Sequence, residues 1–298
     1  MLRQNPAYRP GGSHLTARLA AVLLLATGAC SAPIPRQFPT PIESPAPPAA
    51  PAVPTSWVIA RDLLAREYLV EQAAEISITT DSGTSTDTST LVVEATVRST
   101  TGGGVSGLVR SASVRSAAAT DASFPGVVLP LVFSGTPPSR GSQHQLTGRN
   151  VPADPCQSPS HVLLGSIRDL FVSLPDTVKL GTTWADSGHY DGCRGGARLI
   201  GSSIRRFSLR SYEVRDGQAL LLVDHRSTSR LRGMATRSGD TTVVEGVGSG
   251  SGEFAIDAIS GAVVSTTTSA SLEISIRGAV RLERARQLLR TRILRPDR

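Results

Sequence analysis

Hydrophobic and polar residues alternate along most of the chain after Trp57. A period of two residues is typical of β-strands that bury one face and expose the other to water. Turn residues separate the alternating runs. Asp216-Gly217 is the clearest turn, because both residues of a tight hairpin turn need positive φ angles. The pattern predicts strands at 67–79, 90–98, 105–114, 127–133, 206–214, 218–225, 241–247, 253–258, 262–268 and 271–282.

One segment departs from this alternation. Its apolar residues recur with the spacing of one helical face, Ser158 or Ser160 can cap its start, and Pro175 ends it. The pattern predicts a helix at 160–173, which should pack its apolar stripe on a sheet that is hydrophobic on one face. The stripe consists of Leu163, Ile167, Leu170, Phe171 and Leu174.

These elements indicate a mainly β protein. Residues 55–298 should form an antiparallel meander or half-barrel sheet with one packed amphipathic helix. The strand blocks before and after the helix are similar in length and turn density, which favours a duplicated β unit, although no individual residues repeat. Residues 284–295 fit either a basic helix or a frayed last strand, and they form a basic C-terminal tail.

The N-terminus has the layout of a secretory signal peptide at residues 1–29. A basic stretch precedes the apolar run 19–26, which is far shorter than the ~20 residues that span a bilayer. Thr27-Gly28-Ala29-Cys30 resembles the lipobox of bacterial lipoproteins, although Thr27 replaces the usual larger aliphatic residue. The resemblance implies that Cys30 is acylated and anchors the chain in a membrane. Ordinary cleavage near Ala29 or Ala32, with Cys30 incidental, is the alternative.

A proline-rich linker follows the cysteine. Residues 33–54 hold nine of the 20 prolines and few large apolar side chains, so this segment cannot fold by itself. We interpret residues 30–54 as a lipidated cysteine and a stalk. Ser31, rather than an aspartate, follows Cys30, and resemblance to Gram-negative lipoproteins then favours the outer membrane, on its periplasmic side.

The net charge of +7 lies at the two ends of the chain. Residues 1–29 carry +3 and residues 277–298 carry +6, which leaves −2 for residues 30–276. A slightly acidic body argues against a wide phosphate-binding surface, so we predict no nucleic-acid partner. The basic tail either binds anionic lipid headgroups or is a solvated extension.

Two cysteines besides Cys30 are expected to form a disulfide in an exported protein. A bridge between Cys156 and Cys193 would stabilise the fold by roughly 3–4 kcal/mol. The alternative is a zinc site, because thiol and imidazole ligands gather in one region of the sequence. Its candidate ligands are His144, Cys156, His161, His189 and Cys193. The sequence favours the disulfide, and no metal or other cofactor is predicted.

Two Asp-Ser-Gly triplets begin at Asp81 and Asp186. They resemble the paired aspartates of aspartic proteases, whose carboxylates share a proton and activate water. Asp-Ser-Gly is also ordinary turn chemistry, and the strand residues before each triplet do not fit the protease pattern. The glycines in 246–252 fit no nucleotide-binding motif and are interpreted as a flexible connection or bulge. No catalytic motif is found, and the protein is predicted not to be an enzyme.

The architecture resembles extracytoplasmic lipoproteins of the half-barrel fold, of which LolA and LolB are members. The stretch Leu174-Pro175 to Leu180-Gly181-Thr-Thr-Trp184 is similar to a pattern in uncharacterised bacterial lipoproteins. The resemblance implies a concave apolar face that shelters an acyl chain, although the same face would also serve as a filled core. We therefore expect non-catalytic binding or scaffolding in the cell envelope, with a lipid or apolar ligand. A hydrolase that uses Asp81 and Asp186 is the alternative.

Overall fold

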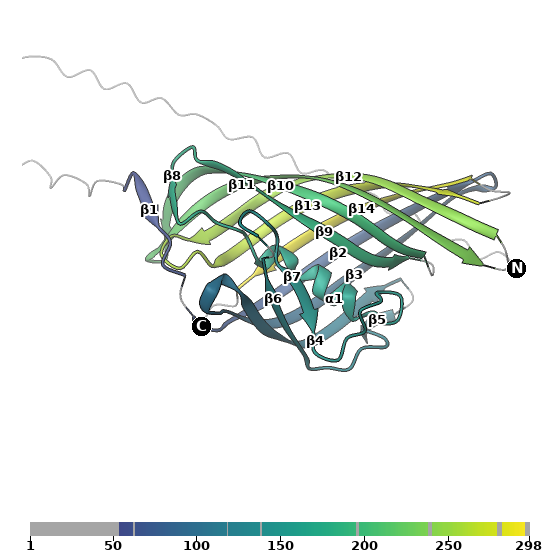
Figure 1. Ribbon diagram of the computed structural model, residues 1–298, viewed down its shortest axis with the longest axis horizontal. Coiled ribbons are helices and arrows are strands. Elements are labelled where there is room, and N and C mark those ends of the chain that lie inside the picture. The colour runs from purple at the N-terminus through teal and green to yellow at the C-terminus, as the bar shows by residue number, and fades with distance from the viewer. Residues whose placement is uncertain are drawn as a thin grey trace, which may run out of the picture. The chain divides into compact units, whose positions relative to one another are not determined.

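The computed structural model describes residues 54–61, 63–117, 119–137, 139–194, 197–237, 240–278 and 282–295. The predicted signal peptide, Cys30 and the linker up to residue 53 lie outside these residues. Ala52–Arg298 form one compact unit. Strands dominate this unit, which confirms the prediction of a mainly β protein (Figure 1).

Twelve strands form one antiparallel sheet. Its order is β7-β6-β4-β3-β2-β14-β13-β12-β11-β10-β9, and β5 pairs with β4 outside this path. The two remaining strands, β1 and β8, pair with each other. The bounds are β1 Ser56–Val58, β2 Arg66–Thr80, β3 Gly83–Ser99, β4 Val105–Ser116, β5 Ala119–Ser123, β6 Leu131–Thr136, β7 Gln145–Gly148, β8 Thr177–Lys179, β9 Thr183–Arg194, β10 Ala197–Arg215, β11 Gln218–Arg237, β12 Asp240–Asp257, β13 Val263–Arg277 and β14 Leu282–Leu294.

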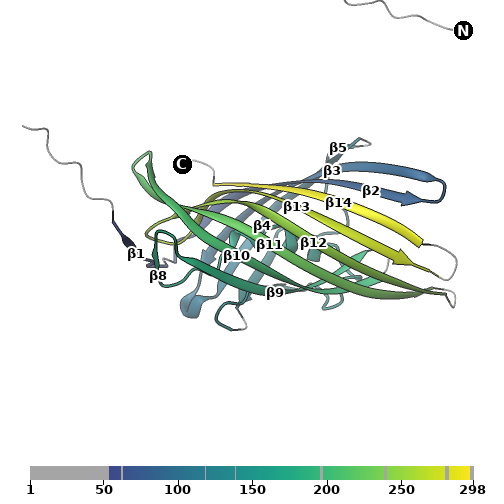
Figure 2. The ribbon, with the colours of Figure 1, turned by 90° about the horizontal axis from the view of Figure 1, so that it is seen from above.

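The two ends of the sheet meet through the segment that precedes β7. The backbone N–H of Gln143 donates to the carbonyl oxygen of Ser187 at 2.7 Å, and the N–H of Ser187 donates to the carbonyl oxygen of Gly141 at 3.0 Å. These bonds make a parallel bridge between Ser142 and Ser187 of β9. The sheet is therefore barrel-like and closes further than the predicted half-barrel. Figure 2 shows the twist of its long strands.

Several predicted strand boundaries are wrong. The sequence missed β9, because its inward residues include Asp186, Gly188 and Gly192, and this hides the alternation. The predicted strands 241–247 and 253–258 are one strand, β12, which runs without a break through the glycines. Those glycines are therefore not a flexible connection.

The C-terminal region also differs from the prediction. The predicted strands 262–268 and 271–282 belong mostly to one strand, β13, and the predicted C-terminal end of the second is wrong, because β13 ends at Arg277 and β14 begins at Leu282. Residues 284–294 pair with β13 on one side and β2 on the other, so they form the last strand, paired on both edges, rather than a basic helix or a tail. The first and last long strands of the domain are thus neighbours, and this pairing spans more than 200 residues of sequence.

The predicted helix at 160–173 is shorter than expected. α1 covers Ser160–Ser166, and the 3₁₀ turn η2 follows at Arg168–Leu170. The hydroxyl of Ser166 donates to the carbonyl oxygen of Leu163 at 2.8 Å, a local bond that competes with the helical pattern where α1 ends. The apolar stripe is buried as predicted. No helix in the described part of the chain is long and apolar enough to cross a membrane.

The inner face of the sheet carries a packed core. One apolar cluster joins β2, β3, β4 and β6 to α1 and η2, around Phe133 and Leu163. A second joins β10–β13 to β1 and β8, around Phe207 and Phe254. A third lies on the inner face at the opposite ends of the long strands, and includes Ile274. The concave apolar face expected from the sequence is thus filled by side chains in these regions.

A disulfide joins Cys156 and Cys193, whose Cα atoms are 4.9 Å apart. This confirms the predicted pairing. Cys156 precedes α1 and Cys193 lies on β9, so the bridge attaches the segment before the helix to one end strand of the sheet.

Candidate functional site

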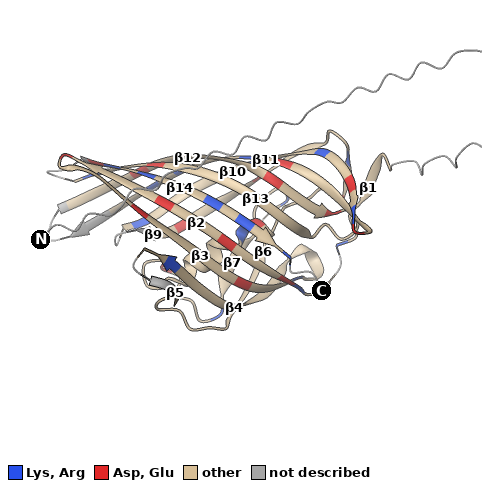
Figure 3. Ribbon diagram, turned by 180° about the vertical axis from the view of Figure 1, so that it is seen from behind, with Lys and Arg blue, Asp and Glu red and all other residues tan. Residues whose placement is uncertain are grey.

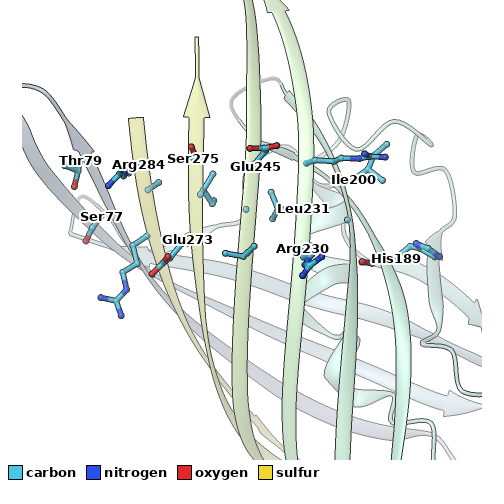
Figure 4. A pocket seen from close by; sticks show the side chains of 18 residues that line it. Ser77, Thr79, His189, Ile200, Arg230, Leu231, Glu245, Glu273, Ser275 and Arg284 are labelled. Carbon is cyan, nitrogen blue, oxygen red and sulfur yellow. The ribbon is translucent and has the colours of Figure 1, made fainter. Parts of the chain in front are cut away.

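An open groove of about 1190 Å³ crosses the outer face of the long strands from β2 to β9 (Figure 4). We call it the arginine groove. Long strands give a barrel-like sheet a waist, because each strand twists along its length. The outward side chains that line the groove are Ser77, Thr79, His189, Ile200, Ser202, Arg230, Arg232, Glu245, Val247, Glu273, Ser275, Arg284 and Arg286.

The register of the sheet places these side chains in two rows across the strands. One row runs through directly paired residues, as Thr79, Arg284, Ser275, Glu245, Arg232 and Ile200. The second row runs as Ser77, Arg286, Glu273, Val247, Arg230, Ser202 and His189. Both rows are visible in Figure 4. The groove is therefore built by long-range strand pairing rather than by any one segment.

The charges of the groove are arranged in a regular way. Arg284 and Arg286 lie on β14, and Arg230 and Arg232 lie on β11. One glutamate stands on each of the two strands between them, and the six side chains sum to +2. None of these four arginines makes an ion pair within 4 Å among the described residues, and all four are exposed. Their guanidinium groups can therefore reach a ligand.

Glu245, one of these two glutamates, has its nearest cation outside the groove. Glu245 lies 3.9 Å from Arg277, which is exposed as well. Exposed pairs of this kind contribute little to stability. The carboxylate is thus available to a ligand in the groove.

The groove is not apparent from the sequence alone. The sequence of residues 284–295 fits a basic helix as well as a last strand, and only in a strand does the separation of Arg284 and Arg286 by two residues put them on the same face. That spacing was the available signal, together with the same spacing of Arg230 and Arg232. The pairing of β14 with β2 and β13 was not visible in any local pattern.

Asp186, one of the two carboxylates of the alternative hydrolase hypothesis, lies inside the sheet and is paired on both of its oxygens. The guanidinium of Arg205 donates to its two carboxylate oxygens, at 2.9 Å from Nε and 2.7 Å from Nη2. The amide of Gln143 adds a hydrogen bond of 3.1 Å. Arg205 also binds Asp169 at 3.2 Å and the carbonyl oxygen of Phe171 at 2.9 Å. The cluster ties β9 and β10 to η2 and to the segment that closes the sheet.

The structure does not bring Asp81 and Asp186 together. Asp81 lies exposed in the turn between β2 and β3, as predicted, whereas Asp186 lies within β9 rather than in a turn. Five strands separate β2 from β9 in the sheet order. The paired-carboxylate geometry of an aspartic protease is therefore not formed.

The five residues considered as zinc ligands are also dispersed. Both thiols are in the disulfide. The ring of His144 pairs with the carbonyl oxygen of Gly103, that of His161 with the carbonyl oxygen of Pro152, and His189 lies in the groove. Within the described ranges, no three His, Cys, Asp or Glu side chains are grouped closely enough to hold a metal ion.

His225 is the most enclosed histidine and lies beside the Arg205 cluster. Its ring centroid is 5.3 Å from that of Phe207 and 5.4 Å from that of Phe254. Burial lowers the pKa of His225 more than the carboxylates of Asp169 and Asp186 raise it, and Arg205 lowers it as well. The imidazole is therefore neutral at neutral pH and belongs to the core.

A second, smaller cavity of about 490 Å³ lies between the start of β2, the glycine turn after β3 and the segment that follows η2. Apolar side chains such as Tyr68, Val97 and Phe171 line it together with Arg61 and His144. Arg61 already binds the carbonyl oxygen of Leu174 at 2.8 Å. Neither cavity is lined by aliphatic residues alone.

Comparisons with known proteins do not assign this chain to a family. No family model and no curated protein matches it. Among solved structures it is similar to OccK2 (OpdF) of Pseudomonas aeruginosa, at 8% identity over 78% of this chain and 99% of the other, with a TM-score of 0.26. It is also similar to the β-domain of the Bordetella autotransporter BrkA, at 12% identity over 78% of this chain and 99% of the other, with a TM-score of 0.21. For OccK8 (OprE) of P. aeruginosa the identity is 8% over 81% of this chain and 100% of the other, and the TM-score is 0.22. TM-scores this low do not support a functional assignment.

Proposed function

We propose that this protein is a non-catalytic binding protein of the cell envelope, and that the arginine groove binds an anionic ligand. The observation that carries the proposal is the set of four exposed arginines without ion pairs, which two strands hold in one groove. Guanidinium groups bind carboxylate, phosphate and sulfate with two parallel hydrogen bonds, and they remain charged at every physiological pH.

The composition of the outer face supports a domain that works in water. Arginine alternates along the outward side of β14, at residues 284, 286, 290 and 292, and charged residues recur on β10–β13 (Figure 3). A face in contact with lipid requires an apolar band, because an arginine in the middle of a bilayer costs about 2–4 kcal/mol. The groove would therefore meet its ligand in the aqueous part of the envelope.

An apolar ligand fits the site less well than an anionic one. The inner face that might shelter an acyl chain holds three packed clusters, and the outward side chains that line the arginine groove are mostly charged or hydroxyl-bearing. The apolar-ligand expectation is therefore replaced in this proposal by an anionic one.

The proposed place of the domain is the outer membrane, on the periplasmic side, with Cys30 as its lipid anchor. The signal-like N-terminus, the proline-rich linker and the disulfide support this place. In a Gram-negative host, the chain should incorporate radiolabelled palmitate, and Cys30→Ser should abolish the label while Cys156→Ser should not. Equal labelling of the two variants would contradict the anchor.

The groove is tested with the chain from Ser31 onward, exported behind a cleavable signal peptide without a lipobox. Arg230→Gln/Arg232→Gln should weaken the binding of fluorescent inorganic polyphosphate about tenfold, because each charge-assisted contact contributes about 1 kcal/mol or more and 1.4 kcal/mol is a factor of ten. Fluorescence polarisation at low salt measures this affinity.

Arg206→Gln/Arg226→Gln is the matched control. These two arginines are exposed and directly paired on the outer face of β10 and β11, and they lie outside the groove. The control removes the same charge and should change the affinity less than about twofold, since only the weak long-range field is altered. An equal loss in both variants would show that net charge, rather than the groove, attracts the anion.

A further inference from the structure

The two glutamates of the arginine groove constrain the kind of anion that it accepts. Strands in a sheet lie about 4.8 Å apart, so the arginine pairs on β14 and β11 are roughly 14 Å apart. A ligand that reaches both pairs passes a glutamate in either row, Glu245 of β12 in the first row and Glu273 of β13 in the second. A uniformly charged chain would place anionic groups against these carboxylates, which is unfavourable.

The same carboxylates suit a ligand whose middle section donates hydrogen bonds. A carboxylate accepts hydrogen bonds from hydroxyl groups, and these bonds are shorter and stronger than bonds between neutral groups. Serine and threonine hydroxyls lie near both ends of the rows, at Ser77, Thr79 and Ser202. These side chains both donate and accept, as sugar hydroxyls do.

Two aliphatic side chains add an apolar component to this polar surface. Ile200 is 54% exposed and Val247 is 56% exposed, and they lie in different rows of the groove. The C–H faces of a sugar ring are apolar and can cover such side chains, which lowers the exposed apolar area.

We propose that the arginine groove binds an acidic glycan in which anionic substituents flank a neutral, hydroxyl-bearing segment. The anionic groups bind the arginine pairs of β14 and β11, and the neutral segment donates its hydroxyl hydrogens to Glu245 and Glu273. This inference rests on the proposed function, because it names the ligand class of the same groove.

Replacing the two glutamates with glutamine should change the affinity of the groove in opposite directions for a glycan and for a uniformly charged chain. Glu245→Gln/Glu273→Gln should weaken the binding of hyaluronan oligosaccharides, which carry a carboxylate on every second ring, about tenfold. The same variant should strengthen the binding of inorganic polyphosphate several-fold, since a repulsive charge is removed and polyphosphate has no hydroxyl segment. Fluorescence polarisation of both probes with the chain from Ser31 onward gives the two values.

Glu67→Gln/Glu94→Gln is the control, because both glutamates are exposed and outside the groove. It should leave the affinity for both probes within about twofold. If Glu245→Gln/Glu273→Gln strengthens or leaves unchanged the binding of hyaluronan, the glycan inference is overturned, while the proposed function stands as long as the arginine variants still weaken binding. If the arginine variants have no effect on either probe, the proposed function itself fails.

Discussion

Replacing Arg205 with methionine is expected to lower the free energy of unfolding by about 3–5 kcal/mol. The side chain of Arg205 is 5% exposed and that of its partner Asp186 is fully buried. Methionine fills much of the same volume, but it leaves the carboxylate of Asp186 with the single hydrogen bond from Gln143. An uncompensated buried charge is far more unfavourable than the loss of a surface ion pair.

Urea denaturation of the exported chain measures this effect, and the next residue provides the control. Arg206 is exposed on the outer face, so Arg206→Met should change the free energy of unfolding by no more than about 0.5 kcal/mol. Asp186→Leu/Arg205→Met removes both charges and should be more stable than Arg205→Met alone. Equal urea midpoints for Arg205→Met and Arg206→Met would show that the ion pair does not stabilise the fold.

The Arg205 cluster shows why the sequence suggested a turn or a catalytic carboxylate at Asp186, which is instead a buried ion-pair partner. An aspartate between small residues is typical of turns, and Asp186, Gly188 and Gly192 interrupt the inward hydrophobic residues of β9, which are Trp184 and Tyr190. The burial of Asp186 depends on Arg205 of β10 and on Gln143, which is 43 residues away. No local pattern contains that partner.

What the sequence predicted well depends on local pattern alone. The buried alternation of Leu221 and Val223, the apolar stripe of residues 163–174 and the cysteine pair were each visible without knowledge of the fold. The arginine groove depends instead on strand register, which places Arg284 opposite Thr79 of β2. Such pairings between distant segments set the sheet order, so a site that crosses seven strands cannot be derived from spacing within any one of them.

Gly252→Val is expected to lower the free energy of unfolding by about 3 kcal/mol, although valine is one of the best strand-forming residues. Gly252 faces inward on β12. A Cβ atom at this position would lie 2.3 Å from the backbone oxygen of Thr267 and 2.7 Å from the Cα atom of Thr268. Both are backbone atoms of β13, so the two paired strands would have to move apart for the side chain to fit.

The neighbouring residue distinguishes this steric effect from a general effect of valine. Ser251 is exposed on the outer face of the same strand, and Ser251→Val should leave the urea midpoint unchanged or raise it slightly. If Gly252→Val and Ser251→Val shift the midpoint equally, the backbone of β13 does not limit the side chain at residue 252, and the steric argument is wrong. A loss confined to Gly252→Val means that the glycines allow close approach of strands, because any Cβ there meets the backbone of β13.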